Sequence, residues 1–278
     1  EGTMKYKRLF ITLLIAISSH LPGSETTKYV RYTHEGQESY GILEGDTVRE
    51  LVGDIFSDPT PSGKTLKLSE VHLLAPCKPT KVIAVGLNYR SHIGNRPVPE
   101  YPGLFAKYPS SIIGQDENIV IPSDATDLHY EGELVVVIGK KAKNISVSKA
   151  PNYIFGVTAG NDVSERKWQQ ADLQWLRAKA SDTFGPVGPA IVTGLNYNDL
   201  LLQTRLNGEI RQSERTKDLV YDVEAIVSYI SHYVTLFPGD LIFTGTPGTT
   251  KAMKPNDIVE IELEGVGILR NKVVSPQQ

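Results

Sequence analysis

The sequence has very little cysteine and no excess of either charge. Cys77 is the only cysteine among 278 residues, which excludes a disulfide within the chain. Lys and Arg number 29 and Asp and Glu number 32, so the net charge is −3 at pH 7. No basic field is present to attract nucleic acid or an anionic membrane, and we expect neither as a partner. The proportions of hydrophobic (40%) and charged (22%) residues are those of an ordinary globular protein.

The first residues have the pattern of a signal peptide. Segment 4–24 consists of a basic start, Met4–Arg8, an apolar run, Leu9–Ile17, and a polar exit. An Ala-x-Ala-like cleavage site is missing, and the apolar run is too short to span a bilayer. The alternative is a plain N-terminal extension over residues 1–27. We expect a cytoplasmic enzyme. Export is the alternative if segment 4–24 acts as a signal peptide.

The pattern of elements predicts an α+β fold that is mainly β. No repeat, heptad or long low-complexity segment is present, and short β-branched apolar runs outnumber helical patterns. A hairpin and a further strand within residues 28–51 predict a small N-terminal β-rich domain over 28–74, followed by a larger domain over 75–278. The clearest helix is expected at Tyr221–Thr235, with Asp222 as its cap.

Three carboxylates mark the most informative stretch of the chain. Glu131 and Glu133 are two residues apart in a β-branched run, so in a strand their side chains share one face. Asp162 follows the end of a second apolar run. Buried ionised carboxylates need a cation nearby. Three carboxylates without a His or Cys cluster fit a hard divalent ion such as Mg²⁺ or Mn²⁺.

A Glu-x-Glu pair has a second interpretation, since it is often only the solvated face of an antiparallel strand. Glu260, Glu262 and Glu264 follow that pattern, because they alternate with apolar residues. After Glu133, in contrast, Leu134–Ile138 runs without polar alternation, which is typical of a strand buried on both faces. The spacing alone leaves both interpretations open.

Four motifs follow one another in a fixed order. They are Glu131-Gly-Glu133, Gly160-Asn-Asp162-Val-Ser-x-Arg166, Arg177-Ala-Lys179-x-x-Asp182-Thr-Phe-Gly-Pro-x-Gly-Pro189 and Thr244-Gly-Thr246-Pro-Gly248. From about Tyr29 to Val274, the sequence resembles the fumarylacetoacetate hydrolase family. The resemblance implies a rolled, mixed β-sheet and two chains paired as a homodimer. It also implies one divalent ion per chain, held by Glu131, Glu133 and Asp162.

A histidine follows the end of a predicted strand at Lys81–Gly86. A lone histidine is more often structural than catalytic, but His92 precedes a Pro- and Gly-rich stretch that could close as a lid. The resemblance implies that His92 is a general base on such a lid. Relatives with hydrolase activity usually carry Glu three residues later, where this chain has Asn95. An amide can orient an imidazole but does not supply the charge of a carboxylate.

Further site residues are expected on a helix and a tight loop. Lys179 lies among small and apolar neighbours and could stabilise developing negative charge, although an ordinary surface lysine is the alternative. The resemblance implies that Lys179 is catalytic and that Gln169 contacts the substrate. Arg166 could contact the substrate or pair with a carboxylate. Backbone amides of the tight loop could bind an anionic substrate group, and this loop contains Thr244, Gly245 and Thr246.

Together these features predict a Mg²⁺- or Mn²⁺-dependent enzyme acting on a small 2-oxo acid. If His92 activates water, the reaction is hydrolytic cleavage of a C–C bond in an acylpyruvate-type acid. If it does not, the same chemistry gives decarboxylation or isomerisation of an acid such as oxaloacetate, and Asn95 keeps this alternative open. A non-catalytic binding protein is a third possibility, which the three carboxylates and Lys179 argue against.

Overall fold

The computed structural model of the chain describes residues 25–276. The signal-like segment 4–24 therefore lies outside the described residues. Across 25–276, no helix has both the length and the apolar character needed to cross a membrane.

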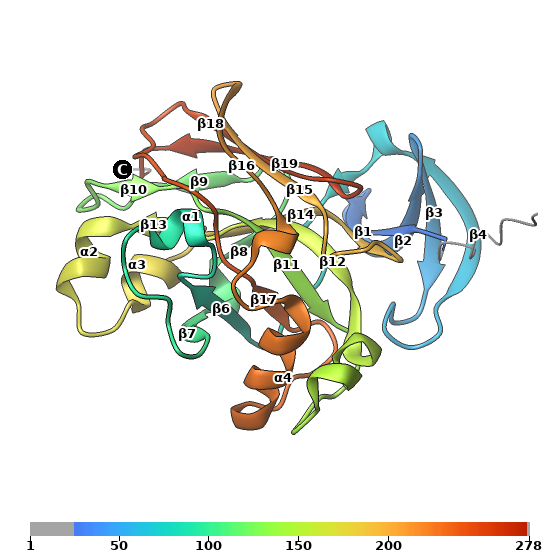
Figure 1. The fold of residues 1–278 in the computed structure, drawn as a ribbon. Coiled ribbons are helices and arrows are strands. Elements are labelled where there is room, and N and C mark those ends of the chain that lie inside the picture. Colours follow the sequence, from blue (N-terminus) through green and yellow to red (C-terminus); the bar gives the residue numbers. More distant parts are fainter. Residues whose placement is uncertain (1–24, 277–278) are drawn as a thin grey trace, which may run out of the picture.

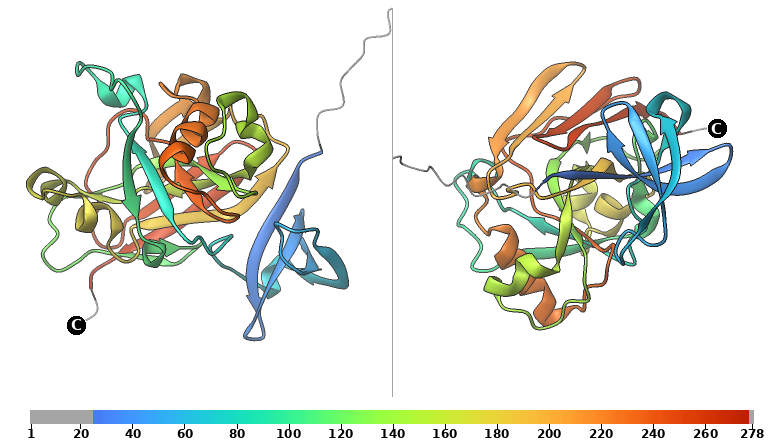
Figure 2. Two further views of the ribbon diagram at one scale, coloured as in Figure 1. Left: turned by 90° about the horizontal axis from the view of Figure 1, so that it is seen from below. Right: turned by 90° about the vertical axis from the view of Figure 1, so that its right-hand side faces the viewer.

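Four antiparallel strands form the N-terminal part of the fold. They are β1 (Thr27–His34), β2 (Gln37–Glu44), β3 (Thr47–Val52) and β4 (Thr60–Lys67). A two-residue turn joins β1 to β2 at Glu35 and Gly36, both with positive φ, a conformation that glycine adopts without a Cβ clash. The predicted hairpin and its following strand are confirmed. These strands lie at one side of the molecule (Figures 1 and 2).

The same sheet continues into the larger part of the chain, because β1 pairs with β14. Twelve strands belong to this sheet, ten of them in the order β4-β3-β2-β1-β14-β12-β11-β17-β6-β7. Its members beyond β4 are β5 (His72–Leu73), β6 (Val82–Gly86), β7 (Gly103–Lys107), β8 (Ile112–Ile113), β11 (Gly132–Ile138), β12 (Ile154–Asn161), β14 (Gly185–Thr193) and β17 (Leu241–Phe243).

A five-stranded sheet packs against the larger one, in the order β16-β15-β18-β19-β9. Its strands are β9 (Asn118–Val120), β15 (Leu201–Leu206), β16 (Glu209–Arg215), β18 (Ile258–Leu263) and β19 (Gly267–Val274). β10 (Leu128–His129) and β13 (Ser164–Glu165) form a separate pair. Parallel pairs occur at β6 with β17, β8 with β14 and β9 with β19, so the predicted mainly β fold with mixed sheets is confirmed.

β11 is the strand around which the core is built. Every residue of β11 is buried. Leu134, Val136 and Ile138 belong to one hydrophobic cluster, while Val135 and Val137 belong to another. Because successive side chains point to opposite faces, both faces of this strand are covered. The absence of polar alternation after Glu133 is thereby explained.

The four α-helices of the described chain are short, except for α4 (Val223–Tyr233). The carboxylate of Asp222 accepts a hydrogen bond from the Ala225 backbone N–H at 2.7 Å, which confirms it as the N-cap. α1 (Arg90–Ile93), α2 (Arg166–Ala171) and α3 (Leu176–Ala180) gather on the side of the molecule away from the N-terminal strands (Figure 1). Each of these three lies at or next to a predicted site residue.

Candidate active site

Glu131 lies between β10 and β11, and its backbone is hydrogen-bonded to Asn161 and Asp162. The side-chain oxygen of Asn161 accepts a hydrogen bond from Glu131 N at 2.9 Å, and Asp162 N donates to Glu131 O at 2.8 Å. The Asn161 side chain thus takes the place of a ladder partner. Glu131 therefore lies between two strands and Glu133 lies within β11, rather than both lying on one continuous strand.

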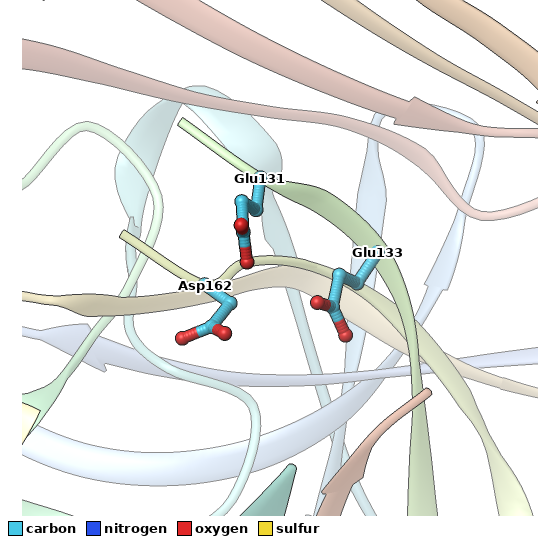
Figure 3. Close-up of side chains that lie close together, drawn as sticks. All are labelled: Glu131, Glu133 and Asp162. Atoms are coloured by element: carbon cyan, nitrogen blue, oxygen red, sulfur yellow. The ribbon is translucent and has the colours of Figure 1, made fainter. Parts of the chain in front are cut away.

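The three carboxylates predicted to hold a metal point toward one another (Figure 3). One oxygen from each of Glu131, Glu133 and Asp162 lies within 4.8 Å of the others. Their residues are only 4%, 1% and 1% exposed, respectively. Three carboxylates this close and this deeply buried repel one another strongly unless cations lie among them.

Glu131 is well compensated by cations of the protein. Burial alone would raise its pKa, but the positive charges of Lys179 and Arg166 outweigh burial and hold the pKa well below its usual range. Glu131 is therefore ionised at neutral pH.

Glu133 is compensated poorly. Burial, together with repulsion from Asp162 and Glu131, raises its pKa well above the ordinary value of 4.5. A hydrogen bond from Gly245 N to Glu133 Oε2, at 2.7 Å, opposes this rise only in part. The site therefore has a carboxylate for which the protein provides too little positive charge.

Two buried lysines face the cluster. Lys179 Nζ donates to Glu131 Oε2 at 2.7 Å and to Asp162 Oδ2 at 2.6 Å, and burial, which would lower its pKa, is outweighed by these carboxylates, which raise it. Lys107 Nζ donates to Asp162 Oδ1 at 2.7 Å and to the backbone carbonyl of Lys179. For Lys107, burial is the stronger influence and lowers the pKa. Asp162 consequently has one lysine on each oxygen.

The cluster of Glu131, Glu133 and Asp162 fits a divalent cation. Carboxylate oxygens are the ligands that Mg²⁺ and Mn²⁺ prefer, and these three oxygens are close enough to share one ion. The raised pKa of Glu133 indicates that the site lacks a positive charge. A bound divalent ion would supply this charge and favour the ionised form of Glu133.

Arg166 begins α2 and lies against the carboxylates. Its Nη2 donates to Glu131 Oε1 at 2.5 Å and to Thr250 Oγ1 at 2.8 Å, and its Nη1 donates to Gln169 Oε1 at 2.9 Å. Arg166 thus pairs with a carboxylate, which was one of the two roles considered for it. Gln169 lies on the same face of the helix, three residues later.

His92 lies in α1 with its ring fixed by a backbone group. Nδ1 is 2.7 Å from Gly248 O, and since a carbonyl oxygen only accepts, Nδ1 carries the hydrogen. Nε2 of the neutral ring then holds the lone pair. Asn95 is exposed and makes no described hydrogen bond to His92. The orientation of the His92 ring therefore does not depend on the side chain at position 95.

The tight loop is used differently from the sequence prediction. Thr244 is fully buried and donates from Oγ1 to Leu134 O at 2.9 Å, and Gly245 N is engaged by Glu133. Neither lines the cavity, whereas Thr246 does. The loop therefore orients Glu133, and of the three loop residues only Thr246 lines the cavity.

A cavity of about 530 Å³ joins these groups. The carboxylates, Lys179, Arg166, Gln169 and His92 line its polar part. Its apolar part includes Phe105 and Trp175, whose rings meet edge to face at 5.3 Å between centroids. Such a cavity suits a small ligand with a charged head and a carbon skeleton.

Comparison with known proteins identifies the family. A model of the fumarylacetoacetate (FAA) hydrolase C-terminal domain matches residues 81–274, which is well over half of the chain. The chain belongs to the fumarylacetoacetate hydrolase family. A model of the N-terminal region of Rv2993c-like proteins matches residues 27–76. The resemblance carried by the four motifs is confirmed.

Several members of the fumarylacetoacetate hydrolase family are similar to this chain along most of its length. Protein Rv2993c of Mycobacterium tuberculosis is 46% identical over 234 residues, 82% of this chain and 88% of that protein. The mitochondrial oxaloacetate tautomerase FAHD2A of Bos taurus is 42% identical over 248 residues, 84% of this chain and 78% of that protein. The crystal structure of 2-hydroxyhepta-2,4-diene-1,7-dioate isomerase from Mycobacterium marinum has a TM-score of 0.86 and 40% identity, and the match covers 91% of this chain and 100% of that one.

Three residues at this family site escaped the sequence analysis. Lys107 ends β7 as a single lysine after an apolar residue, so only its position at the end of a strand could have pointed to it. Arg96 and Thr250 are polar residues in loops and belong to none of the four motifs, yet both line the cavity. Only the packing of segments distant in sequence brings these residues to the same site as the carboxylates.

Proposed function

We propose that this protein is a divalent-metal-dependent enzyme that interconverts the keto and enol forms of a small 2-oxo acid. The observation that carries the proposal is the hydrogen bond from His92 Nδ1 to Gly248 O. It leaves Nε2 of the neutral ring as a proton acceptor. A base that takes one proton and returns it to the same substrate meets the need of keto–enol isomerisation.

Hydrolysis demands more of the histidine. An attacking water must be made nucleophilic, and a carboxylate behind the ring stabilises the imidazolium that forms. Among residues 25–276, no carboxylate forms an ion pair with His92, and Asn95 occupies the position where hydrolases of the family usually carry Glu. Isomerisation involves no attacking water, so it is compatible with Asn95.

The remaining residues suit the same reaction. Mg²⁺ or Mn²⁺, held by Glu131, Glu133 and Asp162, would supply positive charge beside the 2-oxo group. Lys179 would stabilise the negative charge that develops on the substrate oxygen when the proton leaves carbon. Gln169 lines the cavity and would orient the substrate with an amide hydrogen bond.

The relatives support an isomerase. One is named an oxaloacetate tautomerase and another an isomerase of an unsaturated 2-hydroxy dioate. Both names describe movement of a proton within a small 2-oxo or 2-hydroxy acid. An oxaloacetate-like acid is therefore the substrate that we propose.

A second candidate is hydrolytic C–C cleavage of an acylpyruvate. The cavity of about 530 Å³ favours it, because this volume leaves room for a water beside a small substrate. In that reaction, His92 would remove a proton from the water instead of from the substrate.

The test follows oxaloacetate and acetylpyruvate side by side, in EDTA and with added Mg²⁺ or Mn²⁺. Ultraviolet absorbance of the enol reports ketonisation, and product analysis reports pyruvate. We expect metal-restored ketonisation of oxaloacetate, lost in His92→Gln, and little cleavage of acetylpyruvate. The matched variant Asn95→Glu supplies the missing carboxylate and should raise cleavage while leaving ketonisation in place.

Each other result has a clear meaning. Metal-dependent cleavage of acetylpyruvate by the wild type would select the hydrolase. Loss of CO₂ from oxaloacetate without accelerated ketonisation would select a decarboxylase. Activity that ignores EDTA would overturn the metal site, and binding without turnover of either acid would indicate a binding protein.

A further inference from the structure

The cavity has three arginine or lysine side chains in its wall, and one of them lacks an acidic partner. Lys179 and Arg166 both bond to Glu131, so their charges are matched within the cluster. Arg96 also lines the cavity, but no carboxylate of the described residues pairs with it. Arg96 is exposed and lines the cavity, so this residue lies where the cavity meets solvent.

The bonds that Arg96 does make occupy one edge of its guanidinium. Nε donates to Ile93 O at 3.0 Å and Nη2 donates to His92 O at 2.9 Å, so this edge caps the last carbonyls of α1. A helix cap is therefore one role of Arg96. The opposite edge, made by Nη1 and the second hydrogen of Nη2, has no described partner, and its fork fits a carboxylate with two parallel hydrogen bonds.

The balance of charge indicates what this free edge would meet. By formal count, the three negative charges of Glu131, Glu133 and Asp162 are opposed by three positive charges on Lys107, Lys179 and Arg166, although the ion pairs of these cations go to Glu131 and Asp162 and none to Glu133. A divalent ion would then make the cavity strongly positive, and Arg96 adds further positive charge. A ligand with a single carboxylate would leave most of this charge unmatched, whereas a dicarboxylate matches more of it.

We propose that Arg96 is a specificity residue that binds the distal carboxylate of a 2-oxo dicarboxylic acid. This inference rests on the proposed function, in which the 2-oxo acid end of the substrate lies at the carboxylate cluster. The distal carboxylate accepts two hydrogen bonds from the free edge of Arg96, while the other edge keeps α1 and His92 in place. Arg96 thereby selects dicarboxylic over monocarboxylic 2-oxo acids.

The test measures binding, so it does not depend on turnover. Calorimetric titration with saturating Mg²⁺ compares 2-oxoglutarate with 2-oxopentanoate, a pair that differs by a carboxylate in place of a methyl group. A charge-assisted bidentate contact at a partly solvated site predicts about 10-fold tighter binding of 2-oxoglutarate. Arg96→Gln should bring the two dissociation constants together, and Arg96→Lys should keep part of the preference.

Arg90→Gln is the matched control. Arg90 begins α1 and is exposed, and it does not line the cavity; its side chain meets Arg96 only through a long hydrogen bond of 3.4 Å from Nη1 to the Arg96 backbone carbonyl, so its loss should leave the preference intact. If Arg96→Gln weakened both ligands equally, Arg96 would act only through α1 and the inference would be overturned. Equal binding of both acids by the wild type would also overturn it, while the proposed function would stand. Binding of neither acid would overturn the proposed function as well.

Discussion

The chain contains two Glu-x-Glu segments, one of which is buried while the other lies on a solvated face. Glu133 in β11 and Glu131, just before this strand, are buried within reach of a third carboxylate. Glu260 and Glu262 lie on β18, on the face opposite the buried residues of that strand. Glu262 pairs with Arg205 on the neighbouring strand at 2.6 Å. The same local pattern therefore serves as a candidate metal site in one strand and as a solvated face in the other.

The difference arises from what surrounds each pair. β18 alternates buried and half-buried residues, so its glutamates share a face that water reaches. β11 is buried throughout, so its glutamate has no route to water except through the cavity. A carboxylate on such a strand needs cations, which Lys179 and Arg166 supply to Glu131 but not adequately to Glu133. The flanking sequence, rather than the pair itself, decides the outcome.

The largest effect is expected from Glu131→Gln. This change removes one charge from the carboxylate cluster, so affinity for Mg²⁺ and Mn²⁺ should fall and activity should drop about 10³-fold, as expected when several kcal/mol of metal-supplied stabilisation are lost. Isothermal titration with Mn²⁺ and the oxaloacetate ketonisation rate provide the two measurements. Glu262→Gln is the matched control and should change neither. Retained metal binding in Glu131→Gln would remove this glutamate from the ligand set.

Lys179→Met should produce the largest loss of stability. Lys179 is buried and bonded to Glu131 and Asp162, so its removal leaves two buried carboxylates without their shared cation. Breaking a buried pair in this way costs about 3–5 kcal/mol. Urea unfolding in EDTA measures the loss, and added Mg²⁺ should recover part of it, because the ion replaces the missing positive charge. A Lys179→Met protein as stable as the wild type in EDTA would contradict the electrostatic account of the cluster.

The two segments also indicate how far the sequence could be interpreted. Unbroken apolar residues after Glu133 predicted burial on both faces, and the alternation around Glu262 predicted a solvated face; both are local properties. The cap at Asp222 was equally local. Lys107, by contrast, reaches Asp162 across 55 positions of sequence, through pairings between distant strands. No local sequence pattern predicts the contact between Lys107 and Asp162. Lys179 was predicted from the family resemblance, whereas Lys107 was not predicted at all.

Glu133→Gln should stabilise the protein when metal is absent. The pKa of Glu133 is raised by burial and by the neighbouring carboxylates, so the folded protein holds this proton more tightly than the unfolded chain does. Its stability therefore falls as pH rises above the ordinary value of about 4.5. A glutamine side chain cannot ionise, so the variant should gain on the order of 1–3 kcal/mol by about pH 8 in EDTA and nothing below about pH 4. Thermal unfolding across pH tests this, and a wild type that is more stable than the variant at the alkaline end of the range in EDTA would refute it.

The smallest effect is expected from Glu262→Gln. Its partner Arg205 lies on the neighbouring strand, and the Glu262 side chain is 38% exposed, so water and salt screen the pair. An exposed pair of this kind contributes about 0.2–1 kcal/mol at low salt. Urea unfolding should therefore reveal a slight loss that disappears in high salt, with catalysis and Mn²⁺ affinity unchanged. A loss that persisted in high salt would mean that the Glu262–Arg205 pair is shielded from water and salt, as the carboxylates at Glu131 and Glu133 are. The two Glu-x-Glu segments would then differ only in the presence of a third carboxylate, Asp162, near the first.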